Sequence, residues 1–420
     1  MYYHILILLF YVFYISGNIG IVTLGLPKPF LIGVPLVYSL LIAVVYKRTW
    51  ASVEKHTLLL VAGASLVLIF RYMANGETDL KQGLTILVLP ALLVSALPTD
   101  AEFKIQTLET KRLIAWFLFI FYVVECGVAL YEYIVREHLF GWFEPTYYKG
   151  IVSYGKHEEF RSAALLGAPL NNALVVTTLM LFYLFGDRYS MRNKILLWTF
   201  GLIAVFCFNA RLAIVINLAS LLVFLAKGLS GKYTTARINI ILIFLFICLV
   251  VSILYFYGIG GRFWNTDNVR TDGSIGARLK LFKYLLNKDW TDFLWGNSSV
   301  KIQHDMAISI KVKVIENFWV HYIFRYGIVA TSFFAFCYYN IGKHLLSGYS
   351  QFNKITISLF FLLLASSNIS LAASHTPLAV FLLCCYVYRP ASIKDFSSQD
   401  IIRLFSVYAN NKKCNEKGII

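Results

Sequence analysis

Long runs without a single charged residue constrain this chain more than any other feature. Neither Ile5–Leu24 nor Ile238–Ile259 contains an Asp, Glu, Lys or Arg. About 20 apolar residues are needed for a helix to cross the hydrocarbon core of a bilayer, and both runs reach that length. The sequence therefore predicts a chain that crosses a membrane.

The composition of the 420 residues supports this prediction. Charged residues make up 14% of the chain and hydrophobic residues 59%, whereas a soluble domain carries about 25% charged residues. This balance excludes a disordered chain and a secreted disulfide scaffold. The formal net charge is +16, but Lys and Arg punctuate the apolar runs instead of clustering on one face, so no nucleic-acid partner is expected.

The apolar runs predict an all-α polytopic protein, a single integral membrane domain covering residues 1–420. The long runs are Ile5–Leu24, Pro29–Tyr46, Leu113–Val135, Ala164–Gly186, Ile238–Ile259, Phe318–Cys337 and Ile355–Leu371. The shorter ones are Thr57–Phe70, Gly83–Leu97, Ile195–Phe208, Leu212–Ala226 and Pro377–Tyr388. Together they predict twelve transmembrane helices, or ten if Thr57–Phe70 and Gly83–Leu97 form a re-entrant pair.

Lys and Arg in the short connections set the expected orientation, because such residues concentrate in cytoplasmic loops. The basic short segments are 47–56, 98–112, 187–194, 227–237, 339–354 and the tail 389–420. With these inside, both termini are predicted to be cytoplasmic. An outer loop is then expected at 136–163, and a large periplasmic loop at 260–317. Within the latter, Ile275–Asn287 has helical spacing: Leu279, Phe282 and Leu286 share one face, with Leu281 and Leu285 beside it. This run predicts an amphipathic helix on the outer membrane face or over a cavity.

Three polar stretches lie on the predicted outer side. The first is Phe160-Arg161-Ser-Ala-Ala-Leu-Leu-Gly167-Ala-Pro169-Leu-Asn171-Asn172, and the second is Phe208-Asn209-Ala210-Arg211. The third runs from Gly276-Ala-Arg278 through Leu294-Trp-Gly296-Asn297 to Glu316-Asn317-Phe-Trp-Val-His321-Tyr-Ile-Phe-Arg325-Tyr-Gly327.

In this order the stretches resemble the O-antigen polymerase and ligase family of bacterial surface-polysaccharide synthesis. The resemblance covers roughly residues 160–345. In the family's serine-containing turn the serine is replaced by Asn209, displaced by one position, and the following glycine by Leu212. The histidine of the ligase His-Asn pair aligns with Glu316, which favours a polymerase over a ligase.

The resemblance implies a lipid-dependent glycosyltransferase fold and a donor glycan linked to a polyprenyl diphosphate. Arginine suits a departing diphosphate, because its planar fork binds phosphate oxygens bidentately and keeps its charge. The diphosphate- or substrate-binding candidates are Arg161, Arg211, Arg278, Asn171, Asn317 and Arg325. The attacking hydroxyl needs a base, for which the catalytic candidates are Glu316 and His321, with His304 as a further option.

Several of these residues also have purely structural interpretations. Arg211 could extend its charged end to the outer interface, Glu316 could cap the helix that begins near Phe318, and His321 and Arg325 could satisfy each other on one helical face. Glu125 and Glu132 lie within an apolar run and have no assigned role. The outer segments contain no Asp-x-Asp pair or His/Cys cluster, so neither a metal nor another cofactor is expected.

The expected function is that of a metal-independent glycosyltransferase of the cell inner membrane, which polymerises undecaprenyl-diphosphate-linked repeat units at the periplasmic face. The alternatives are an O-antigen ligase that transfers polymer to lipid A core and a non-enzymatic flippase for lipid-linked oligosaccharides. The polymerase hypothesis leaves room for a chain-length regulator and a separate flippase as partners.

Overall fold

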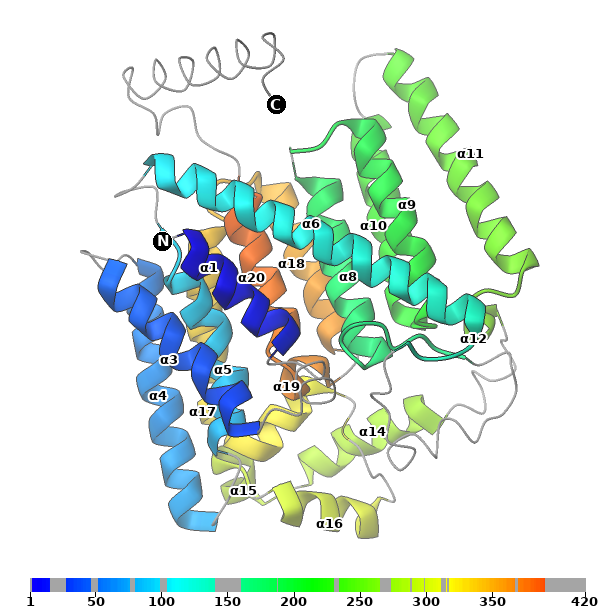
Figure 1. The fold of residues 1–420 in the computed structure, drawn as a ribbon. Helices are drawn as coiled ribbons and strands as arrows, with labels where there is room; N and C mark the ends of the chain where they lie inside the picture. The colour runs from blue at the N-terminus through cyan, green and yellow to red at the C-terminus, as the bar shows by residue number, and fades with distance from the viewer. Residues whose placement is uncertain are drawn as a thin grey trace.

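The protein is an all-helical bundle in every part of the chain that the computed structural model describes (Figure 1). Those parts are residues 2–15, 28–46, 52–75, 80–98, 104–139, 160–186, 188–229, 234–264, 273–287, 289–297, 299–310, 315, 317–366 and 369–389. No strand occurs in these ranges. The predicted all-α class is therefore confirmed for the described residues.

Each apolar run predicted from the sequence contains a helix in its described part, although residues 16–24 of the first run lie outside the description. In chain order these are α1 (Tyr2–Phe10) with its continuation η1 (Tyr11–Ile15), α3 (Lys28–Tyr46), α4 (Ser52–Asn75), α5 (Leu80–Ser95), α6 (Lys104–Val135), α8 (Pro169–Phe185), α9 (Met191–Cys207), α10 (Arg211–Leu229), α11 (Thr234–Phe256), α17 (Phe318–Leu345), α18 (Gln351–Ser366) and α20 (Thr376–Val387). Most of these helices begin before the apolar run itself, and α6 does so by nine residues, at Lys104 instead of Leu113. The run from Ala164 is the opposite case, because it becomes helical only at Pro169.

Among the residues that the structure describes, four helices are long and apolar enough to cross a membrane. Their length and composition fit a membrane location. Their apolar parts are Val53–Met73, Thr107–Val135, Arg211–Gly228 and Phe318–Leu345. The helix α6 is 32 residues long, which corresponds to about 48 Å at 1.5 Å per residue. This exceeds a hydrocarbon core of about 30 Å, and α6 lies obliquely across the bundle in Figure 1.

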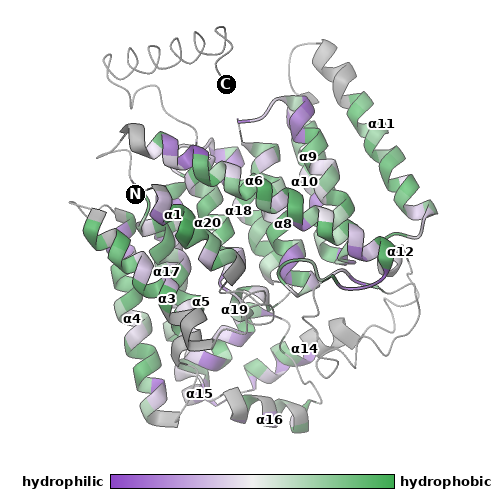
Figure 2. Cartoon of the chain, viewed as in Figure 1, coloured by the Kyte–Doolittle hydropathy of each residue, from purple (hydrophilic) through white to green (hydrophobic). Residues whose placement is uncertain are grey.

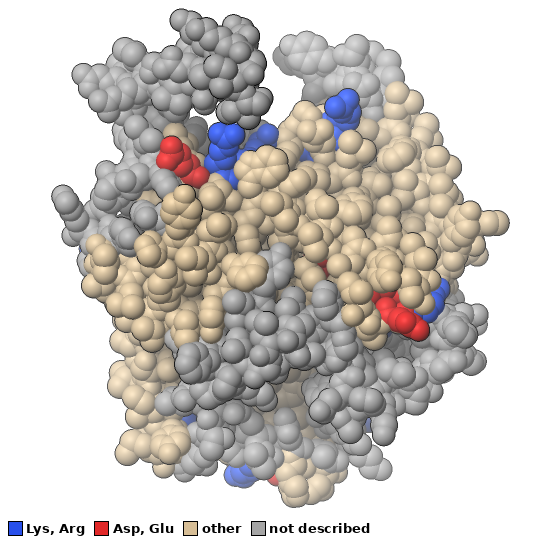
Figure 3. Space-filling view, in the orientation of Figure 1, with Lys and Arg blue, Asp and Glu red and all other residues tan. Residues whose placement is uncertain are grey.

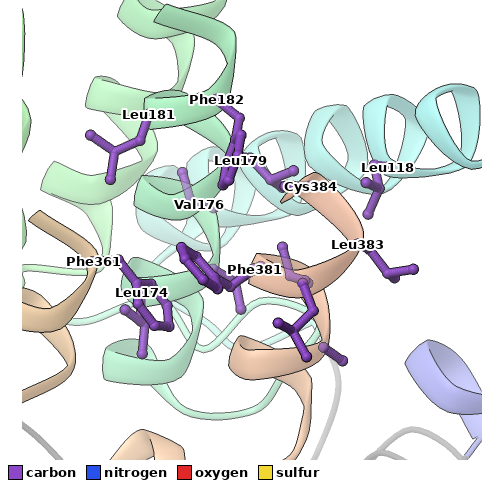
Figure 4. Close-up of a cluster of buried hydrophobic side chains, with 14 of the residues drawn as sticks. Leu118, Leu174, Val176, Leu179, Leu181, Phe182, Phe361, Phe381, Leu383 and Cys384 are labelled. Carbon is purple, nitrogen blue, oxygen red and sulfur yellow. The ribbon is translucent and has the colours of Figure 1, made fainter. Parts of the chain in front are cut away.

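The centre of the bundle is formed by α8 and α20. Nearly every side chain of α8 is buried, and so are those of α20 apart from Leu378. Phe381 of α20 stacks on Phe361 of α18 with ring centroids 4.0 Å apart, and its ring also meets that of Phe182 on α8. Figure 4 shows these rings among aliphatic side chains. Helices that are apolar all round are typical of such interior positions.

The polar parts of the chain lie at two opposite ends of the bundle. The beginning of α9, the end of α10 and the beginning of α11 lie toward the top of Figure 1, whereas α14 (Gly273–Leu286), α15 (Trp290–Trp295) and α16 (Ser299–Ser309) lie at the bottom. Hydrophilic residues of the described chain occur near these ends (Figure 2). In the face that Figure 3 shows, Lys and Arg lie at the top and again toward the lower edge, and most described surface between them carries no charge.

The predicted helix in the large loop is present as α14, but a different face of it is packed. Leu281 and Leu285 are buried, and they join Val320 and Phe324 of α17 in a small second core. Phe282 and Leu286, which the sequence placed on the main apolar face, are exposed. The helix thus packs against the beginning of α17 and leaves apolar side chains on its outer side.

Candidate functional site

A non-helical segment buried inside the bundle dominates the site. Residues 160–168 connect to the start of α8, and Ser162, Ala163 and Ala164 are 0% exposed. Ala164 adopts a left-handed backbone conformation with φ 38°, which is costly for a residue with a Cβ. Buried N–H groups outside a helix need other partners, above all in an apolar bundle.

Two glutamate side chains of α6 supply those partners. Oε2 of Glu132 accepts hydrogen bonds from the Ser162 hydroxyl at 2.6 Å and from the N–H groups of Ala163 and Ala164 at 2.8 and 2.9 Å. Oε2 of Glu125 accepts from the N–H of Leu165 at 3.2 Å. The glutamates for which the sequence gave no role therefore hold this segment in place. Apolar periodicity carries no signal for such contacts.

The turn between α9 and α10 packs directly against this segment. The N–H of Ser162 donates to the carbonyl of Cys207 at 3.1 Å, and Nε of Arg161 donates to the carbonyl of Phe208 at 3.1 Å. Asn209 is left-handed with φ 53°, and Arg211 begins α10. The first two predicted stretches, which are nearly 50 positions apart in the sequence, thus meet at one junction.

Arg136 is a third arginine at this junction, and the sequence analysis did not single it out. It follows the last residue of α6 and is left-handed, with φ 63°. Its guanidinium carbon lies 4.1 Å from the ring centroid of Tyr133 and 5.9 Å from that of Phe160, the neighbour of Arg161. It is also close enough for its charge to act on the thiol of Cys207. Its position one residue after a long apolar run was the only sequence signal.

The third predicted stretch forms a second non-helical contact. The N–H of Asn297 donates to the carbonyl of Phe324 at 2.8 Å, where α17 is interrupted at Gly327 (φ 78°). From α4, the buried Arg71 donates to the carbonyls of Trp295, at 3.2 Å, and of Asn297. The 294–297 part of this stretch is thereby joined to its 317–327 part.

This second region also contains the predicted site residues Asn317, His321 and Arg325. Asn317 caps α17: its side-chain oxygen accepts from the N–H of Val320 at 3.1 Å, and its Nδ2 donates to the carbonyl of Ser366 at 2.7 Å. His321 and Arg325 are partly buried on α17, and the charge of Arg325 acts on His321. His304 is exposed on α16.

Asn171 is partly buried in the first turn of α8, next to Asn172, whose Nδ2 donates to the carbonyl of Ala163. Glu316 lies outside the described residues, and so do 140–159, 265–272 and 390–420 of the predicted loops and tail. Arg278 lies on α14, but its side chain is outside the description. The residue that caps the start of α17 is Asn317.

The two regions lie on the same side of the bundle and are bridged by one short helix. The hydroxyl of Tyr322 on α17 donates to the carbonyl of Leu371 at 2.9 Å. Leu371 belongs to α19 (Ser370–Ala373), which packs against both α17 and α8. Both regions lie in the lower half of Figure 1.

Within the described ranges, no group of three His, Cys, Asp or Glu side chains could hold a metal ion. A scan of the chain against models of known protein families gives no match, and no curated protein matches it either.

Proposed function

We propose that this chain is a surface-polysaccharide polymerase of the bacterial inner membrane. It would join oligosaccharide repeat units carried on undecaprenyl diphosphate, at the periplasmic face. The observation that carries the proposal is the junction of Arg161 with the turn that precedes Arg211, since Arg161 donates to Phe208 of that turn. Two arginines from distant parts of the sequence are thereby brought to one junction.

The proposed reaction breaks the C1–O bond between the growing glycan and its diphosphate. The bond electrons remain with the diphosphate oxygen, and a hydroxyl of the incoming lipid-linked unit forms the new C1–O bond. The hydroxyl proton passes to a base, for which Glu316 and His321 are the candidates. Arg161 and Arg211 would stabilise the departing diphosphate, with Arg278 as a third candidate, because a guanidinium pairs bidentately with phosphate oxygens.

The lipopolysaccharide ladder of a deletion strain separates this function from its alternatives. Loss of only the multi-repeat bands is the expected result. Loss of every O-antigen band, including the single-repeat band, would instead support a ligase or a flippase. A flippase should also carry its cations along a central channel, whereas Arg161 precedes α8 and Arg211 is the first residue of α10.

The proposed orientation has its own experiment. Reporters fused at Ala51, Glu102 and Ser230 should be cytoplasmic, and those at Gly150 and Asn297 should be periplasmic. A cytoplasmic signal at Asn297 would contradict the proposed orientation and place the active site on the wrong face for periplasmic polymerisation.

Arg211→Lys tests the chemistry most directly. A lysine keeps the charge but cannot reproduce the bidentate fork, so polymerisation should fall nearly as far as with Arg211→Ala at equal protein level. A normal ladder from Arg211→Lys would favour an Arg211 that only extends its charge to the membrane interface.

A further inference from the structure

We propose that Arg136 and Asn209 complete the diphosphate-binding site at this junction. The inference rests on the proposed function, because it names further residues of that same site. The diphosphate of the lipid carrier would be bound between the end of α6, the 160–168 segment and the α9–α10 turn. Neither residue was a binding candidate from the sequence.

Both residues carry buried polar atoms that have no hydrogen-bond partner among the residues described. The unpaired atom of Arg136 is Nη1, and the unpaired atoms of Asn209 are Nδ2 and Oδ1. Asn209 is 1% exposed. Because buried donors are almost always satisfied, each such group requires an explanation. Two donors from separate segments beside one turn indicate a group that accepts hydrogen bonds from both.

The surroundings of Arg136 favour an anion as that group. Tyr133 and Phe160 contact its guanidinium through their rings, and such contacts leave the in-plane N–H groups available for other hydrogen bonds. Among the described residues Arg136 has no ion pair with a carboxylate. The adjacent Glu137 is exposed. The oxygens of Glu132, one turn earlier, accept from Ser162, Ala163, Ala164 and Leu139.

The three arginines converge on the same few residues. The charge of Arg136 interacts electrostatically with the thiol of Cys207. Nε of Arg161 donates to the carbonyl of Phe208, and Arg211 lies two residues after Asn209. A diphosphate carries more oxygen acceptors and more charge than a monophosphate, so a site with several guanidinium groups should prefer it. Phospholipid headgroups offer the same phosphate chemistry with a single phosphate, and a binding experiment must separate these sources.

The experiment measures binding of undecaprenyl diphosphate to the full-length protein in nanodiscs, with undecaprenyl phosphate and phosphatidylglycerol as comparison lipids. The wild type should prefer the diphosphate. Arg136→Gln should weaken diphosphate binding by about tenfold or more, as expected for the loss of a hydrogen bond to a charged group. Arg136→Lys should lie between Arg136→Gln and the wild type. Arg192→Gln, at an exposed arginine near the start of α9 at the opposite end, is the matched control and should bind as the wild type does.

Two substitutions at Asn209 test the sign of the charge while keeping the turn. Asn209→Gly removes the side chain and tolerates the left-handed backbone. Asn209→Asp keeps the shape but adds a negative charge, and Asp also tolerates this conformation. If the site binds an anion, Asn209→Asp should weaken diphosphate binding further than Asn209→Gly. Equal binding by the two variants would overturn the proposal, and this pair remains informative if Arg136→Gln does not fold.

The outcomes also separate this inference from the proposed function. If Arg136→Gln and Asn209→Asp bind the diphosphate normally while Arg211→Ala does not, the inference fails and the proposed function stands. If the wild type binds all three lipids equally, or if Arg211→Ala and Arg161→Ala also bind normally, the diphosphate site itself is refuted and both proposals fail.

Discussion

Two non-helical bends inside this bundle are held by buried charges of opposite sign. At the first bend, Glu132 of α6 accepts hydrogen bonds from the N–H groups of Ala163 and Ala164. At the second, Arg71 of α4 donates hydrogen bonds to the carbonyls of Trp295 and Asn297. At each bend the backbone leaves the helical hydrogen-bond pattern. The acidic side chain then accepts from its N–H groups, and the basic side chain donates to its carbonyl groups.

This difference shows that charges within apolar helices of this protein have two kinds of role. A charged residue within the membrane is by default a candidate for function, but Glu132 and Arg71 mainly satisfy backbone groups that would otherwise be orphaned. Arg161 lies in the first bend itself, and Arg211 begins α10 beside the turn that packs against this bend. They therefore remain the candidates for binding substrate.

The largest expected effect is that of removing the carboxylate at the first bend. Glu132→Ala leaves the N–H groups of Ala163 and Ala164 buried without this acceptor. At about 1–3 kcal/mol for each unsatisfied donor, the protein should lose about 2–6 kcal/mol of stability. Thermal unfolding in detergent measures the loss. Glu109→Ala, at an exposed position of the same helix, is the control and should change little. Equal unfolding temperatures for the two variants would refute the anchoring role of Glu132.

At the second bend, a methyl group on Gly327 should be the most disruptive small change. A Cβ there would lie 2.1 Å from the carbonyl oxygen of Leu294, and φ is 78°. Gly327→Ala should cost about 2 kcal/mol or more and increase hydrogen exchange in 289–297. Gly342→Ala, in the same helix with no heavy atom within 4 Å of its Cβ, should instead stabilise slightly. If both variants behave alike, the contact between the outer segment and Gly327 is not tight.

Arg71→Lys should have a smaller effect at the same bend. A lysine keeps the positive charge but cannot bond both carbonyls with a fixed fork, so a loss of about 1–2 kcal/mol is expected. Amide exchange at Asn297 should rise, because its N–H bond to Phe324 depends on the position of this segment. Arg192→Lys, at an exposed site, should leave this exchange unchanged. Unaltered exchange in Arg71→Lys would show that α17 alone holds the segment.

The helices could be predicted from the sequence because each one requires a local apolar run. The first bend could not, since its apolar Ala163–Leu166 reads as part of the following span; only Pro169, which favours the first turn of a helix, marked the true start of α8. Nor could the pairing of Glu132 with this segment be predicted, because it joins residues about 30 positions apart and leaves no periodic trace.

The site was also predictable only where its residues stand out locally in the sequence. Arg161 and Arg211 were identified as charges beside apolar runs, and their common junction emerged only when the backbone bonds between 161–162 and 207–208 were known. The face of α14 was predicted incorrectly, because the order of leucines allowed two adjacent apolar faces and the contact with Val320 and Phe324 selected Leu281 and Leu285.

The smallest expected effect is that of Asn317, in the second region. Its substitution distinguishes a role in capping α17 from a role in binding substrate. Both ends of its amide are used: Oδ1 caps α17, and Nδ2 bonds the carbonyl of Ser366. Asn317→Ala should therefore cost about 1 kcal/mol, as for other N-caps. Asn317→Asp retains the cap and loses only the donor to Ser366, so its cost should be smaller. Ser190→Ala, at the exposed cap of α9, gives the effect of losing a cap far from the site. If Asn317→Ala were as stable as the wild type and yet abolished polymerisation, Asn317 would contact the substrate, as the family resemblance implies, and the second region would share the binding role assigned to the first.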